Sequence, residues 1–125
     1  MNRHRIARLK AYEKQGGRCF WCGVPTRRET ADKGVFLAPS TAEHLIPKSR
    51  GGTNSQRNIV SACKQCNCCR GSMPLAMWLI VLRETLIVQR RTHHFNEVLS
   101  SLRDRGIHAP TLVGYPGDGP DPETR

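Results

Sequence analysis

The sequence predicts a small α+β protein whose core is built on a four-cysteine zinc site. Two pairs of the form C-x-x-C, Cys19/Cys22 and Cys63/Cys66, offer four sulfur ligands. Apolar residues recur at helical spacing in residues 3–15, and a later run over 75–88 is apolar on nearly every face of a helix. Short apolar segments bounded by Gly and Pro favour strands between the cysteine pairs. A chain of 125 residues fits one domain.

The elements follow in order along the chain. The first helix is predicted because Ile6, Leu9 and Tyr12 recur on one face, and Gly16 and Gly17 end it. Pro74 suits the first turn of a later helix, and Gly106 ends the last one. The expected elements are a helix over 3–15, strands over 34–38 and 41–47, a loop over 48–58, a helix or zinc knuckle beginning in 59–71, and helices over 74–91 and 93–106.

These elements suggest four segments of the chain. We expect a basic N-terminal helix over 1–15, a core with the zinc knuckles over 16–72, C-terminal helices packing on the core over 73–109, and a disordered tail over 110–125. The tail is rich in Pro, Gly and acidic residues.

The formal net charge of +10 points to a polyanionic partner, most simply DNA. The N-terminus has no signal-peptide pattern, and the longest apolar run is too short to span a membrane. We therefore expect a cytoplasmic protein of a bacterial or phage-infected cell, without a membrane partner. In a reducing compartment, six cysteines favour a metal site over disulfides.

The cysteine pattern leaves one choice of ligands open. Cys66 and Cys69 also form a C-x-x-C pair, so Cys63 and Cys66 are one of two possible partners for Cys19 and Cys22. A redox dithiol is a further alternative, although a single pair would suffice for it. A four-thiolate zinc site has no open coordination position, so it would support folding and not catalysis.

The stretch EHLIPKSRGGTNSQRNIVSACKQCN, residues 43–67, resembles the HNH nucleases of the ββα-metal, treble-clef-like fold. Their pattern is a carboxylate and a His, a Pro, a Gly-Gly loop, an Asn, and a C-x-x-C pair followed by His or Asn. The resemblance covers roughly residues 16–71 and favours Cys63/Cys66, because the residue that follows this pair is Asn67. The matching positions are Glu43, His44, Pro47, Gly51, Gly52, Asn58, Cys63, Cys66 and Asn67.

The resemblance implies roles at the catalytic site for four residues, three in the chemistry and Asn58 in positioning. His44 would be the general base that activates water, and Glu43 with Asn67 would hold one catalytic Mg²⁺ or Mn²⁺ beside the structural zinc. Asn58 would tie the loop across the ββα unit and orient the strand that carries His44. This chain has Glu where the family most often has Asp, and Asn at the last position gives an H-N-N variant.

The predicted function is metal-dependent hydrolysis of DNA, most simply double-stranded DNA. The rival interpretation is a catalytically inactive zinc-finger module that binds nucleic acid. A homodimer or a larger phage or prophage assembly is a possible context. The basic residues expected to contact phosphates flank the loop and the second cysteine pair, and they are Lys48, Arg50, Arg57, Lys64 and Arg70.

Overall fold

A hairpin of two antiparallel strands lies at the centre of the protein, whose computed structural model describes residues 2–29 and 37–107. Strands β1 (Ser40–His44) and β2 (Ile59–Cys63) pair so that Ser40 faces Cys63 and His44 faces Ile59. A 3-10 turn, η1 (Lys48–Arg50), lies in the loop between them. Together with the helices around it, this hairpin confirms the α+β prediction.

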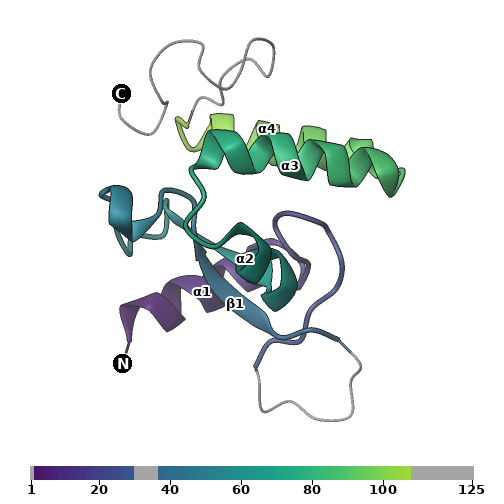
Figure 1. Cartoon of the computed structure of the whole chain (residues 1–125). Helices are drawn as coiled ribbons and strands as arrows, with labels where there is room; N and C mark the ends of the chain where they lie inside the picture. Colours follow the sequence, from purple (N-terminus) through teal and green to yellow (C-terminus); the bar gives the residue numbers. More distant parts are fainter. Residues whose placement is uncertain (1, 30–36, 108–125) are drawn as a thin grey trace.

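Four α-helices surround the hairpin in the described part of the chain (Figure 1). Helix α1 packs against both strands, and α2 follows β2 without a gap. Helices α3 and α4 pack on each other and form a separate layer above the hairpin. The bounds of the helices are Arg3–Lys14 for α1, Lys64–Arg70 for α2, Leu75–Val88 for α3 and Thr92–Asp104 for α4.

The sequence prediction was wrong about residues 59–63, which form β2 before α2 begins. All five residues of β2 are buried, so the strand shows none of the apolar-polar alternation that marks a half-exposed strand. Most of the strand expected over 34–38, and the tail expected over 110–125, lie outside the described residues.

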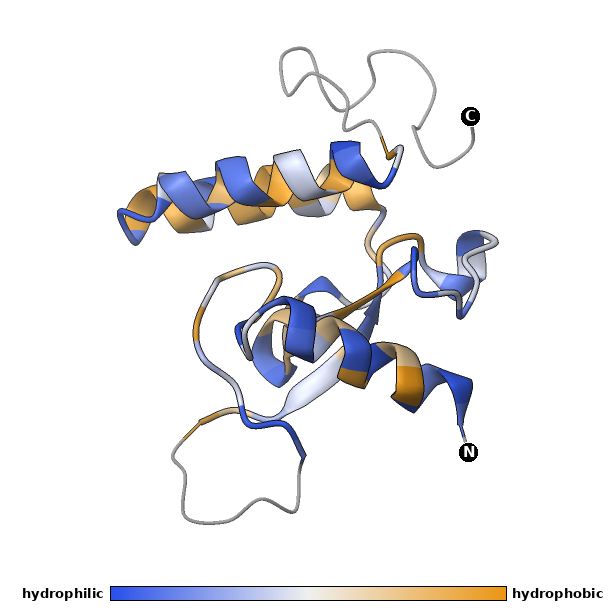
Figure 2. Ribbon diagram, turned by 180° about the vertical axis from the view of Figure 1, so that it is seen from behind, coloured by the Kyte–Doolittle hydropathy of each residue, from blue (hydrophilic) through white to orange (hydrophobic). Residues whose placement is uncertain are grey.

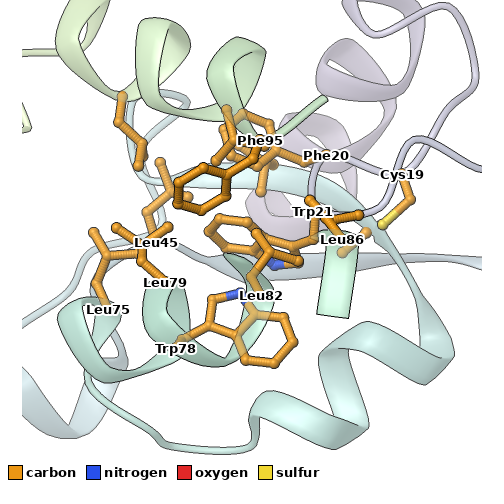
Figure 3. Close-up of a cluster of buried hydrophobic side chains, with 14 of the residues drawn as sticks. Cys19, Phe20, Trp21, Leu45, Leu75, Trp78, Leu79, Leu82, Leu86 and Phe95 are labelled. Carbon is orange, nitrogen blue, oxygen red and sulfur yellow. The ribbon is translucent and has the colours of Figure 1, made fainter. Parts of the chain in front are cut away.

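The core joins the first cysteine pair to helices α3 and α4. Trp21, which lies between Cys19 and Cys22, is fully buried and meets Trp78 of α3 edge to face, with ring centroids 5.9 Å apart (Figure 3). Phe20 packs edge to face on Trp21 at 4.9 Å. Burial of this aromatic cluster fixes the position of the first knuckle relative to the C-terminal helices.

Helix α4 is amphipathic, whereas α3 is apolar around most of its circumference. In α4, Phe95, Val98 and Leu102 are buried on the side facing α3, and hydrophilic residues cover the other side (Figure 2). In α3, Met77 and Val88 are among the exposed apolar side chains. No helix among the described residues combines the length and apolar character needed to cross a membrane.

Candidate active site

A pocket of about 300 Å³ brings the end of β1 together with α2 and the turn that follows α2. Three residues expected at a catalytic site, Glu43, His44 and Asn67, line this pocket together. Asn67 is the fourth residue of α2, so the hairpin and the helix must both fold before the three meet. The other residues of the lining are Ala42, Pro47, Lys48, Ser49, Gly71 and Ser72.

The imidazole of His44 is held by two residues that the sequence did not indicate. Its Nε2 lies 2.8 Å from the Oδ1 of Asn54, and its ring stacks on that of His4 with centroids 5.1 Å apart. An amide oxygen only accepts hydrogen bonds, so Nε2 carries the hydrogen and the lone pair of Nδ1 is available as a base. Burial lowers the pKa of His4, and electrostatic interaction with His44 and Lys48 lowers it further. The lowered pKa favours a neutral His4 ring in this stack.

The Glu43 side chain is buried, whereas its strand neighbours Ala42 and His44 are half-buried. Its Oε2 accepts a hydrogen bond of 2.9 Å from the indole Nε1 of Trp21, and its Oε1 lies 3.6 Å from Nη1 of Arg70. Burial raises the pKa of the Glu43 carboxyl, against the lowering effects of Arg70 and Trp21. The carboxylate therefore has two protein partners as well as a place in the pocket wall.

Asn67 is oriented by both hydrogens of its amide. Its Nδ2 donates to the hydroxyl of Thr41 and to the carbonyl of Ala42, each at 3.0 Å. These bonds fix the amide plane against β1 and leave Oδ1, a hard oxygen donor, for another partner.

Asn58 forms hydrogen bonds across the loop that joins β1 to β2. Its Oδ1 accepts from the backbone N–H of Ile46 at 2.8 Å, and its Nδ2 donates to the carbonyls of Ile46 and Thr53. Gly52 allows this close approach, because a Cβ there would lie 1.7 Å from the Ile46 carbonyl oxygen. Asn58 therefore holds the strand that carries His44 and has no contact with the pocket itself.

The four expected cysteines come together at the other end of the hairpin. The sulfurs of Cys19, Cys22, Cys63 and Cys66 all lie within 4.8 Å of one another, and the Cys22 and Cys63 sulfurs are 3.9 Å apart. Tetrahedral Zn–S bonds of about 2.3 Å place sulfurs about 3.8 Å apart, so the cluster fits zinc.

The backbone of each knuckle also suits bound thiolates. The N–H of Cys22 points to the Cys19 sulfur, and the N–H of Cys66 points to the Cys63 sulfur, at 3.5 and 3.4 Å. Cys69 is exposed and outside the cluster, so the pair Cys66/Cys69 is excluded as the second knuckle.

Comparison with known proteins assigns this part of the chain to a family. Residues 19–72 match the profile of the HNH endonuclease family. Residues 19–72 form an HNH endonuclease domain. The match contains the four cysteines, the hairpin and the pocket described above, and it confirms the resemblance found in the sequence.

The chain is also similar to parts of two much larger proteins. The CRISPR-associated endonuclease Cas9 of Corynebacterium diphtheriae is 29% identical over 72 residues, which are 57% of this chain and 6% of that protein. Cas9 of Actinomyces naeslundii is 32% identical over 79 residues, 62% of this chain and 6% of that protein. The chain thus spans about 6% of the length of either relative. No solved structure matches significantly.

The five basic residues predicted to contact phosphate lie in three different environments of the HNH domain. Lys48 lines the pocket and is exposed, Arg50 lies in the same turn, and Lys64 is exposed at the start of α2. Arg57 is exposed too, but lines a different groove, beside α1.

Arg70 is the one predicted phosphate contact that lies in the interior of the HNH domain. Its side chain has no exposed surface, and it donates to the carbonyls of His44, Leu45 and Met73. Its position after the second knuckle suggested a DNA contact. In the structure, Arg70 is instead buried and connects the end of α2 to the end of β1 through hydrogen bonds. Its guanidinium is therefore not available to phosphate.

Proposed function

We propose that the chain is a metal-dependent endonuclease that hydrolyses DNA phosphodiester bonds at the pocket of the HNH domain. The observation that carries the proposal is the convergence of Glu43, His44 and Asn67 on one pocket, with Nε2 of His44 held by Asn54. Family membership of residues 19–72 supports the same reaction class.

The protein groups have separate tasks in this proposal. His44 takes a proton from water at Nδ1, while Asn54 keeps the opposite nitrogen protonated and the ring oriented. Glu43 and the Oδ1 of Asn67 form a hard oxygen donor set that suits Mg²⁺ or Mn²⁺ better than zinc. Such a cation, when bound, would stabilise negative charge on the phosphate and the departing oxygen.

The zinc proposed for the four-cysteine cluster has a structural task. With four thiolates, the ion has no open position for water or phosphate. We place the nuclease core at 16–72, with α1 and the α3–α4 pair as its flanks, and take double-stranded DNA as the substrate. Four zinc-binding thiolates and two further cysteines without a disulfide suit a reducing compartment, such as the cytoplasm of a bacterial or phage-infected cell. A homodimer or a phage assembly is the proposed context.

One observation favours the second candidate, an inactive zinc-finger module that binds DNA. The Glu43 carboxylate already has Trp21 and Arg70 as partners, so its role can be explained without a cation. The two candidates differ in a single property, which is whether DNA is cut.

A plasmid-cleavage assay distinguishes them. We expect the zinc-loaded protein to convert supercoiled DNA to nicked or linear forms when Mg²⁺ or Mn²⁺ is added, and not when the cation is omitted. Omission is preferable to a chelator, because a chelator would also remove zinc. The absence of cleavage with Mg²⁺, Mn²⁺ and Ni²⁺ would favour the inactive module.

Asn54→Ala is expected to lower the cleavage rate about 10- to 100-fold, by analogy with the loss seen when hydrogen-bond partners of metal-binding histidines are removed. The amide fixes the tautomer of His44, and the Asn54 side chain makes no other hydrogen bond in the described part of the chain. The rate of cleavage at a fixed Mg²⁺ concentration measures the effect. Asn96→Ala on the exposed side of α4 is the control. A wild-type rate for Asn54→Ala would contradict the assigned tautomer.

A further inference from the structure

A second groove, of about 510 Å³, lies between α1 and the C-terminal end of α4. It is larger than the active-site pocket, and its wall carries four cationic side chains and one carboxylate, that of Asp104. We call it the basic groove, and its four cations are Lys10, Lys14, Arg57 and Arg105.

The two arginines of the basic groove hold each other in place. Nη2 of Arg57 donates to the carbonyl of Arg105 at 2.9 Å, and Nη1 of Arg105 donates to the carbonyl of Arg57 at 2.9 Å. Burial lowers the pKa of the Arg105 guanidinium, and the nearby positive charge of Arg57 lowers it further. Two like charges are thus fixed side by side, at an electrostatic cost that an anion in the groove would offset.

No carboxylate of the described residues forms an ion pair with any of the four cations. The lysines are exposed on successive turns of α1, with Lys14 four residues after Lys10. They also make no hydrogen bond through their side chains in the described structure. The basic groove therefore presents positive charge that no ion pair among the described residues neutralises.

The basic groove leads towards the active site. A smaller pocket of about 350 Å³ shares Ala7 and Gln56 with the groove and is also lined by Asn54, the residue hydrogen-bonded to His44. Arg3 adds a further cation to this connecting pocket. A polymer with phosphates at regular intervals could thus follow α1 from His44 to the basic groove.

The length of α1 indicates how much DNA this path would hold. Its 12 residues rise about 18 Å along the helix axis. A DNA strand carries one phosphate per about 3.4 Å of axis, so the path spans roughly five nucleotides. A contact at this distance would hold the flank of the substrate and leave the scissile phosphate to the pocket.

We propose that the basic groove binds the sugar–phosphate backbone of the DNA flank, roughly five nucleotides from the bond that is cut. The role of the flank rests on the proposed nuclease function, but the binding itself does not. Three of the four cations come from outside the matched segment 19–72, so the flanking helices would add this contact to the HNH domain. Backbone contacts of this kind give affinity and register without sequence preference.

The test is the salt dependence of DNA binding by Lys10→Gln/Lys14→Gln. Both lysines are exposed and do not bond to the fold, so the pair removes charge with little structural change. All variants carry His44→Ala, so a fluorescent duplex of about 20 base pairs stays intact during anisotropy measurements. We expect about tenfold weaker binding near 0.1 M salt, and a slope of log K against log salt that is smaller by about 2.

The matched control is Arg83→Gln/Arg90→Gln. It removes two exposed cations, one in the second half of α3 and one just after its C-terminus, and neither lines the basic groove. Its slope should equal that of the parent. An unchanged slope for the lysine pair, or an equal loss in the control, would overturn the proposal. The outcomes distinguish failure of the two proposals. If the lysine pair variant has a smaller salt slope but the wild type does not cleave DNA, only the nuclease proposal fails. If the wild type cleaves DNA but the slope of the lysine pair variant is unchanged, only the groove proposal fails.

Discussion

Cys63→Ser is expected to prevent the protein from folding stably, and to lower its zinc content from about one ion per chain to near zero. The four sulfurs come from two distant knuckles, so the cluster joins the first knuckle to the end of β2. Apparent zinc-binding energies of about 10–16 kcal/mol are comparable to the whole stability of a small domain, about 5–15 kcal/mol. Serine keeps a side-chain oxygen at the N-terminus of α2 but supplies no thiolate.

Thermal unfolding and metal analysis measure this effect, and Cys69→Ser is the matched control. Cys69 is exposed and lies outside the cluster, so its replacement should leave both zinc content and melting temperature unchanged. A folded Cys63→Ser protein that retains zinc, or the loss of zinc from Cys69→Ser, would show that the sulfur ligands have been assigned wrongly.

Arg70→Met is expected to lower the free energy of unfolding by about 3–5 kcal/mol, the range for removing one partner of a buried ion pair. The guanidinium is fully buried, and it supports the backbone carbonyls of His44, Leu45 and Met73. Methionine fills much of the volume, but it leaves these carbonyls without the Arg70 donor and Glu43 without its cationic partner. Because the His44 carbonyl is among them, cleavage should fall as well.

Chemical denaturation of four variants separates the ion pair from the carbonyl contacts. Glu43→Gln, Arg70→Met and the double variant complete a double-mutant cycle whose coupling energy belongs to the pair. Arg83→Met, at an exposed position, should change stability by less than about 0.5 kcal/mol. A cost below about 1 kcal/mol for Arg70→Met would contradict the structural role given to this arginine.

Features that depend on local spacing could be predicted from the sequence. The C-x-x-C pairs, the helix signals near Pro74 and Gly106, and the segment that contains β1 are local patterns, and the structure contains each of them. The strand β2 was missed because burial on both faces removes the alternation by which strands are recognised.

The details of the site depend on contacts between residues far apart in the chain. Nothing near Asn54 or His4 in the sequence shows that they meet His44, because one lies in the loop and the other on α1. Likewise, a basic residue beside a knuckle looks the same whether it faces solvent or, as Arg70 does, the interior. The hydrogen bond from Trp21 to Glu43 likewise depends on the fold, because the two residues lie 22 positions apart in the chain.

The most direct test of the central claim is the rate of plasmid cleavage by wild-type protein and by His44→Ala in Mg²⁺. General-base catalysis contributes about 10²- to 10⁴-fold, so we expect His44→Ala to be slower by at least about 100-fold. His93→Ala, at an exposed histidine of α4, should cleave at the wild-type rate. Equal rates for wild type and His44→Ala, with both proteins folded and zinc-loaded, would contradict the assignment of this pocket as the nuclease site.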